Sequence, residues 1–155
     1  MSPLKLRKIP ARKLAFCIKP SGYYNIKSQR LKEFLRFFFG RYRASLKAMA
    51  AQETARLRSD LLSVKGIGEE TADSMLLYAL RRPVFVIDAY TKRFLSRHKF
   101  VKEGATYGEA QNLFMRNLKP SVVLFNEYHA LFVRLGKEFC LKRRPKCEGC
   151  PLKEV

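Results

Sequence analysis

The feature that most restricts the fold of this chain is a pair of glycines, Gly66 and Gly68, between two segments with helical periodicity. Apolar residues recur at helical spacing before the glycines, in residues 55–63, and after them, in residues 69–80. Glycine lets the chain turn sharply and exposes backbone N–H groups at the start of the second helix, where an anion is stabilised. We therefore predict a helix-hairpin-helix over residues 55–80. The second helix is expected to bury Ala72, Met75, Leu76 and Ala79.

Helical patterns also cover the N-terminal part of the chain. Residues 11–18 predict a short helix, in which Cys17 is expected to be a buried, small apolar side chain. Residues 29–39 predict a longer amphipathic helix, with Ser28 as its N-cap and Gly40 as its stop.

The C-terminal part is expected to be helical as well. Thr106 and Glu109 have the spacing of a capping box, which predicts a helix through Leu118, and a further helix over residues 121–135 is expected to stop at Gly136. The apolar run 84–87 is too short for a sheet and predicts a buried extended connection to a helix that starts after residue 88. The expected fold class is all-α.

The charge of the chain favours a nucleic acid as its partner. The sequence has 32 Lys and Arg against 13 Asp and Glu, a formal net charge of +19 on 155 residues. Such a surface attracts polyanions over a Debye length of roughly 8 Å. A ribosomal protein or a protein that binds anionic membranes would share this charge. The 47% of apolar residues exclude a disordered basic tail.

The hairpin and a following aspartate are the candidate functional residues. Lys65, Gly66, Ile67 and Gly68 are expected to contact the backbone of one DNA strand, which fixes position without reading sequence. A tight turn used only for packing is the structural alternative. Asp88 precedes a helix, so as an isolated residue it would be interpreted as an N-cap.

Together, the segments 62–68 and 86–88, followed by Lys92 and Arg93, resemble the endonuclease III superfamily of DNA glycosylases. The resemblance implies a partial helical barrel domain over residues 1–82 and a cluster-bearing helical domain over residues 83–155. It also implies that Asp88 is the catalytic aspartate, in the groove between the two domains. A carboxylate there would stabilise the positive charge that develops on the sugar when a flipped-out damaged base is removed.

Glu70 departs from the pattern of the resembled family. Bifunctional members carry at this position a lysine that attacks the sugar as an amine nucleophile, and a carboxylate cannot form a Schiff base. We therefore expect a monofunctional glycosylase with little AP lyase activity. Glu70 itself is expected to be a first-turn helix residue favoured by the helix dipole, with a catalytic role as the alternative.

The segment 21–27 resembles the 3-methyladenine glycosylases of endonuclease III type. This resemblance favours alkylated purines as substrates, and Tyr23 and Tyr24 are candidates to stack on such cationic rings, although both could equally be packing residues. Two alternatives remain open. The chain could be a bifunctional endonuclease III-like glycosylase acting on oxidised pyrimidines, or a truncated DNA-binding module without catalysis.

Three cysteines near the C-terminus are candidate metal ligands in the Cys-rich loop 140–155. Cys140, Cys147 and Cys150 have a C-x6-C-x2-C spacing, and the resemblance implies a [4Fe–4S] cluster whose fourth cysteine would fall immediately beyond Val155. Zinc with His98 or His129 as fourth ligand, or no metal, are the alternatives. The loop also carries basic residues expected to contact phosphate: Lys142, Arg143, Arg144 and Lys146.

The remaining expectations concern the chain's ends, location and partners. Resembled family members carry a segment before the position of Met1, so the chain is expected to be truncated at both ends. No stretch approaches the roughly 18 apolar residues of a membrane span, and no signal core is present. We expect an intracellular, nucleoid-associated monomer that binds double-stranded DNA containing a damaged base and has no membrane partner.

Overall fold

The computed structural model of the protein describes residues 2–154, and this part of the chain contains helices and no strands. The predicted all-α class is therefore confirmed. Residue contacts divide the chain into two compact units, Met1–Gly68 and Glu69–Val155. The domains expected at 1–82 and 83–155 remain predictions. Among the described residues, none of the helices combines the length and the apolar character that crossing a membrane requires.

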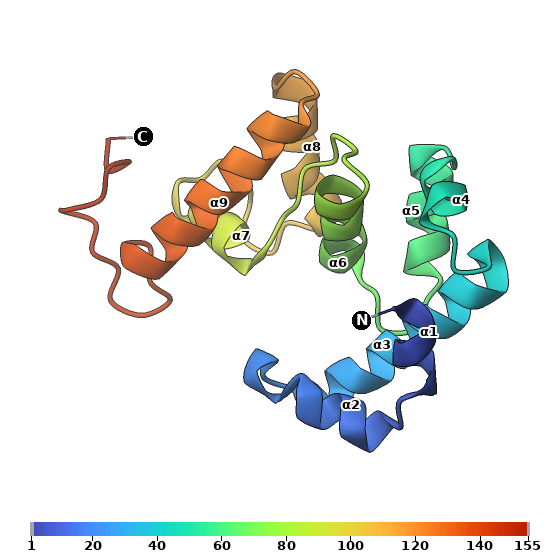
Figure 1. The fold of residues 1–155 in the computed structure, drawn as a ribbon. Helices are drawn as coiled ribbons and strands as arrows, with labels where there is room; N and C mark the ends of the chain where they lie inside the picture. Colours follow the sequence, from blue (N-terminus) through green and yellow to red (C-terminus); the bar gives the residue numbers. More distant parts are fainter. Residues whose placement is uncertain (1, 155) are drawn as a thin grey trace. The chain divides into compact units, whose positions relative to one another are not determined.

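The first unit is built around one long helix, α3, against which α1 and α2 pack (Figure 1). Its elements are α1 (Pro3–Lys8), α2 (Ala11–Cys17), the 3-10 turn η1 (Lys19–Ser21), α3 (Tyr24–Tyr42), α4 (Leu46–Ala50) and α5 (Thr54–Leu62). The helices predicted over 11–18 and 55–63 are present within one residue of their expected ends. Sequence periodicity missed the short helices α1 and α4.

The long helix extends beyond both of its predicted ends. Ser28 is not an N-cap: it is buried inside α3, and its hydroxyl donates to the Asn25 carbonyl at 2.8 Å. Gly40 does not stop the helix, because the apolar face continues to the buried Tyr42 and a helical glycine costs only about 1 kcal/mol. The helix ends where Arg43 takes a left-handed backbone conformation with φ of +51°.

Cys17 is exposed, so the prediction that it is buried was wrong. The buried face of α2 consists of Leu14 and Ala15, which lie against α3. Cys17 is the last residue of α2, and from there the chain turns into η1. Its thiol is therefore not part of the core.

The second unit contains α6 (Glu69–Ser74), the π-helical turn η2 (Met75–Ala79), α7 (Ala89–Arg97), α8 (Tyr107–Asn117) and α9 (Val122–Glu138). The helix predicted over 69–80 is thus not regular throughout. A π turn contains more residues than an α turn and rotates the later side chains. Leu77 is buried as a result, whereas Ala79, which was expected to face the core, is exposed.

Residues 84–87 form a buried extended connection, as predicted, and pair with no strand in the described chain. Side chains of α8 bind part of its backbone: the Ile87 N–H donates to the Tyr107 hydroxyl at 3.2 Å, and the Gln111 amide donates to the Phe85 carbonyl at 2.6 Å. The Phe85 ring stacks on Phe114, with 3.8 Å between ring centroids. The segment that leads to Asp88 is therefore held at both its backbone and its side chains.

The capping box predicted for α8 is correct, since Thr106 and Glu109 form it. Ser121, which was expected as the first residue of the next helix, is the N-cap of α9, and its hydroxyl accepts from the Leu124 N–H. Gly136, however, lies inside α9, which continues to Glu138. A Cβ atom on residue 136 would lie 2.3 Å from the Tyr90 ring of α7, so glycine is needed here for the close approach of two helices.

Candidate active site

The predicted hairpin follows α5 at the end of the first unit. Gly66 has φ of +91°, whereas Gly68 has no positive φ, so only the first glycine is required by the backbone conformation. The turn is closed by the Ile67 N–H, which donates to the Val64 carbonyl at 3.0 Å. Within residues 2–154, the N–H groups of Gly66 and Gly68 form no hydrogen bond. Both remain available to an anion, as the contact with a DNA strand requires.

Replacing Gly66 by alanine is expected to weaken DNA binding. A Cβ atom there would lie 2.5 Å from Cγ of Arg30, and the left-handed backbone would be strained by about 1–2 kcal/mol. Relaxation of the turn would move the two free N–H groups, so we expect a several-fold higher Kd for duplex DNA in fluorescence anisotropy.

Gly104 provides the matched control for this substitution. It also has a positive φ, of +80°, but a Cβ atom there meets no atom within 4 Å, and the residue lies in a loop of the second unit. Gly104→Ala should impose a similar backbone strain and leave the Kd unchanged. Equal losses of affinity in both variants would contradict the role of the hairpin.

Asp88 caps α7, and Thr91 holds one oxygen of its side chain. Its Oδ1 atom accepts two hydrogen bonds from Thr91, from the backbone N–H at 2.7 Å and from the hydroxyl at 2.8 Å. The residue is only 8% exposed, and Thr91 is fully buried. The N-cap interpretation is therefore correct, and it leaves the second carboxylate oxygen, Oδ2, free of Thr91.

The His129 ring lies next to Oδ2, and Tyr78 is hydrogen-bonded to the other side of that ring. The Nε2 atom of His129, on α9, is 3.7 Å from Oδ2, and the His129 Nδ1 atom is hydrogen-bonded to the Tyr78 hydroxyl of η2. Burial lowers the pKa of His129, and the nearby negative charge of Asp88 opposes this only in part. Although Tyr78 is 49% exposed, partial burial, with a further contribution from Asp88, raises the pKa of its hydroxyl. Both groups are therefore neutral near pH 7.

Glu70 lies on the first turn of α6, as expected from the sequence. Although part of its side chain is exposed, partial burial raises the pKa of Glu70, and the negative charge of Asp88 raises it further. The two carboxylates of the second unit thus interact electrostatically. Glu70 takes up a proton more readily than an ordinary glutamate does, while it offers no amine nucleophile.

The three C-terminal cysteines line one cavity of about 200 Å³. All three are free thiols, and the Arg97 guanidinium donates to the Cys140 Sγ atom at 3.3 Å and to the Leu141 carbonyl at 2.7 Å. Among residues 2–154, no three Cys, His, Asp or Glu side chains converge tightly enough to hold a single metal ion.

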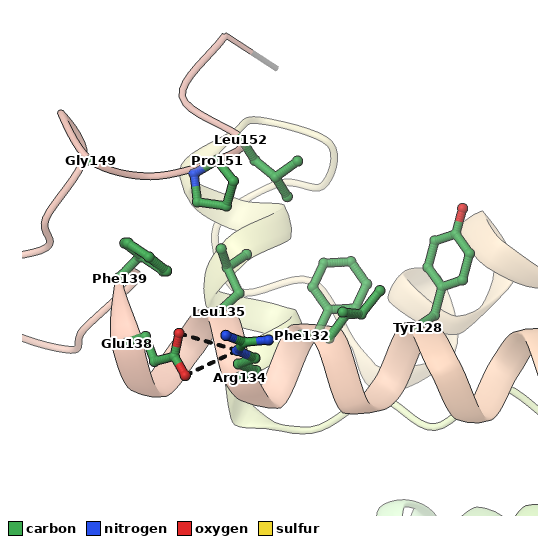
Figure 2. A pocket seen from close by; sticks show the side chains of 10 residues that line it. Tyr128, Phe132, Arg134, Leu135, Glu138, Phe139, Gly149, Pro151 and Leu152 are labelled. Carbon is green, nitrogen blue, oxygen red and sulfur yellow. Dashed lines mark hydrogen bonds and ion pairs between the residues drawn. The ribbon is translucent and has the colours of Figure 1, made fainter.

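The second unit also has an apolar cavity of about 630 Å³, between α9 and the segment that includes Pro151 and Leu152 (Figure 2). Apolar side chains of α9, including Phe132 and Leu135, line it, and an ion pair between Arg134 and Glu138 crosses its rim, with 3.0 Å between Nε and Oε1. None of the residues that line this cavity was predicted as a site residue.

The other predicted binding residues lie at the surface. Tyr23 is 83% exposed and has a left-handed backbone, whereas Tyr24 is partly buried as the first residue of α3. The four basic residues between Cys140 and Cys147 are exposed: Lys142, Arg143, Arg144 and Lys146. Their roles as DNA and base contacts stay predictions.

Sequence reasoning did not identify the partners of Asp88. Thr91 could have been found, because it stands three residues after an N-cap aspartate, where a hydroxyl can return a hydrogen bond to the cap. Tyr78 and His129 are 51 residues apart in the sequence, and no local pattern connects them. Only the tertiary packing of η2 and α9 brings them together.

A family comparison agrees with this arrangement of hairpin and aspartate. The profile of the HhH-GPD superfamily, described as base excision DNA repair proteins, matches residues 1–120. The chain belongs to this superfamily. The match includes both the 66–68 hairpin and Asp88, so the resemblance to the endonuclease III superfamily of DNA glycosylases, found from the sequence, is confirmed.

Individual relatives extend the comparison over nearly the whole HhH-GPD chain. A protein of Methanocaldococcus jannaschii, provisionally named a DNA repair glycosylase, is 42% identical over 155 residues, covering 99% of this chain and 70% of its own. The crystal structure of H. pylori 3-methyladenine DNA glycosylase bound to 1,N6-ethenoadenine has a TM-score of 0.74 at 30% identity, covering 88% of this chain and 67% of that one.

The fold is also that of endonuclease III. A non-covalent endonuclease III–DNA complex superimposes with a TM-score of 0.79 at 19% identity, covering 99% of this chain and 67% of the endonuclease. The predicted fold family is thereby confirmed. The HhH-GPD chain spans 70% of its M. jannaschii relative, 44% of the endonuclease III of Sulfolobus acidocaldarius and 66% of that of Thermotoga maritima.

Proposed function

We propose that this chain is a base excision repair glycosylase that binds duplex DNA and hydrolyses the N-glycosidic bond of a flipped-out, damaged base. The observation that carries the proposal is the state of Asp88. One oxygen is held by two hydrogen bonds from the buried Thr91, and the other is free of that residue. Such a carboxylate is oriented before the substrate arrives and loses little energy in reorganising.

The chemistry follows from that orientation. As the base departs, positive charge develops on the sugar, and a fixed carboxylate in a poorly hydrated environment stabilises this charge strongly. The same oxygen can accept a proton from the water that attacks the sugar. We assign to Asp88 both stabilisation of the sugar cation and orientation of that water.

We propose that the reaction is monofunctional. A lyase step requires an amine that forms a Schiff base with the sugar, and Glu70 supplies a carboxylate instead. Glu70 is at the same time the candidate for a second catalytic carboxylate, because it lies on the first turn of α6 and interacts electrostatically with Asp88. After borohydride reduction, no covalent protein–DNA adduct should form on gels. A trapped adduct would contradict this assignment.

The proposed substrates are alkylated purines. Support comes from the 30% identity to the H. pylori 3-methyladenine glycosylase and from the exposed ring of Tyr23, which is open to stacking. A cationic alkylated ring is attracted to the face of an aromatic side chain, and its glycosidic bond is already weakened. Release of oxidised pyrimidines and not of alkylated purines would instead indicate an endonuclease III-like specificity.

We further propose that Cys140, Cys147 and Cys150 hold a [4Fe–4S] cluster, which would fix the shape of the basic loop between the first two cysteines. Their common cavity supports this proposal. The test is metal and sulfide analysis of anaerobically purified protein. Iron with acid-labile sulfide in equal amounts, and a brown colour, are expected, while zinc alone or no metal would overturn it.

The glycosylase proposal is tested by release of the base from duplex oligonucleotides. Separate substrates carry 3-methyladenine, 7-methylguanine, uracil or thymine glycol, and each is assayed under single-turnover conditions. We expect release of the methylated purines. If DNA is bound but no base is released from any substrate, the chain is a binding module and the proposal fails.

A further inference from the structure

We propose that Tyr78, His129 and Asp88 form a hydrogen-bonded chain in which His129 acts as a positioning residue for the aspartate. The three residues come from different elements of the second unit: η2, α9 and the N-cap of α7. The inference deepens the proposed function and depends on it, because it assumes that Asp88 is the carboxylate that performs the reaction.

The two carboxylate oxygens of Asp88 have different neighbours. Thr91 satisfies Oδ1 with two hydrogen bonds, so this oxygen has a fixed place. The protein group that faces Oδ2 is Nε2 of His129, at 3.7 Å. Within the described residues, this Nε2 atom is buried and has no hydrogen-bond partner. A buried donor without a partner is costly, and a slight closure toward Oδ2 would satisfy it.

The Tyr78 hydroxyl on one side and Asp88 on the other together select which His129 nitrogen carries the proton. Because it is hydrogen-bonded to Nδ1, the hydroxyl can donate its proton there and leave the hydrogen on Nε2, where it faces the carboxylate. In the opposite tautomer, a lone pair of Nε2 would face a negatively charged oxygen. The neutral imidazole with hydrogen on Nε2 is thus the form that fits both neighbours.

This arrangement gives His129 a defined task during the reaction. Hydrogen bonds in enzymes without substrate are often long and shorten in the reactive complex. A bond from Nε2–H to Oδ2 would favour the ionised carboxylate and restrict its rotation. The titratable groups around His129 are Asp88 and Tyr78, and the charge of Asp88 also acts on Glu70 of α6.

The activity test compares two substitutions of His129. His129→Leu removes the donor, and we expect single-turnover base release to fall about ten- to a hundredfold, with the acid limb of its pH profile displaced to higher pH and KM unchanged. His129→Gln places an amide N–H near the former Nε2 and should restore the pH profile. Equal profiles for the wild type and His129→Leu would overturn the proposal.

A matched pair of hydroxyl deletions tests the first link of the chain. Tyr78→Phe removes the donor to Nδ1 and should also displace the acid limb. Tyr128→Phe, in the residue next to His129, deletes a hydroxyl from a ring that packs against Phe114 and Phe132 and should leave the profile unchanged. If both variants, or neither, displaced the acid limb of the pH profile, the proposed role of the Tyr78–His129 hydrogen bond would be contradicted.

A magnetic resonance measurement separates this inference from the proposed function. The 15N shifts of the His129 ring should show hydrogen on Nε2, and the pKa of His129 should fall in Asp88→Asn, because Asp88 favours the protonated ring. Hydrogen on Nδ1 would overturn the chain even in an active enzyme. If the wild type releases no base, the proposed function fails. The 15N shifts would still show whether Tyr78, His129 and Asp88 are linked by hydrogen bonds.

Discussion

The Asp88→Asn variant is expected to release damaged bases about 10²–10³-fold more slowly than the wild type, with its fold intact. Asparagine has the same shape, and its carbonyl oxygen can still accept the two hydrogen bonds from Thr91, so α7 keeps its cap. What is lost is the negative charge that stabilises the developing sugar cation. The measurement is the single-turnover rate, with circular dichroism to confirm the fold.

An equivalent substitution outside the site is the control. Asp60 in α5 accepts hydrogen bonds from the Arg41 guanidinium at 2.7 Å and the Tyr42 hydroxyl at 2.9 Å. Partial burial acts to raise the pKa of Asp60, but these hydrogen bonds outweigh it, and the pKa lies below its ordinary value.

The sign of the control's effect follows from that lowered pKa. The ionised Asp60 stabilises the folded state above its unfolded-state pKa, and this stabilisation is lost as the pH falls through the folded-state value. Asp60→Asn should therefore lower stability at neutral pH while leaving base release unchanged. A comparable loss of activity in both variants would show that charge removal in general, and not the position of Asp88, explains the result.

The Phe85→Ala variant is expected to lose about 3–5 kcal/mol of stability. Phe85 is fully buried, stacks on Phe114 and meets Phe125 edge-on, with 5.2 Å between ring centroids. The Tyr128 ring also packs edge-on against Phe85, so truncation leaves a cavity between three aromatic rings that cannot all move inward. Urea unfolding followed by circular dichroism gives the free energy, and base release should also fall because residue 85 lies on the segment that leads to Asp88.

Phe100→Ala provides the comparison for Phe85→Ala in the same unit. Its side chain is 47% exposed and stacks on Phe94, at 6.2 Å between ring centroids. We expect a loss of less than about 1 kcal/mol. If both substitutions destabilise the protein equally, the Phe85 cluster is not the centre of the core.

Most helices could be predicted from the sequence because the periodicity of apolar residues follows the buried faces. The errors arose where a local signal competed with burial. Ser28 and Gly40 resemble helix ends, yet the apolar face of α3 continues past both, and its burial outweighs a weak propensity. Gly136 also resembles a helix stop, because glycine is common at helix ends. The contact with Tyr90 explains why a glycine stands inside α9.

The candidate site was predictable to the extent that it is encoded in short segments. Asp88 and the 66–68 hairpin each stand in a local motif, and the cysteines have a characteristic spacing. The partners of Asp88 are a different case, because Tyr78 and His129 meet only through a π turn and the packing of α9. Sequence periodicity predicted a regular α-helix at η2, which placed Leu76 correctly in the core but also placed Ala79 there, whereas Leu77 is the second buried residue of the turn.

The glycine at position 136 has a consequence for how sequences related to this one can vary. The Tyr90 ring occupies the space that a side chain on residue 136 would need, and this contact lies between the helix that Asp88 caps and the helix that carries His129. Even one methyl group there would force α7 and α9 apart and lengthen the gap between carboxylate and imidazole. In a related sequence, a residue larger than glycine at position 136 would therefore require a residue smaller than tyrosine at position 90.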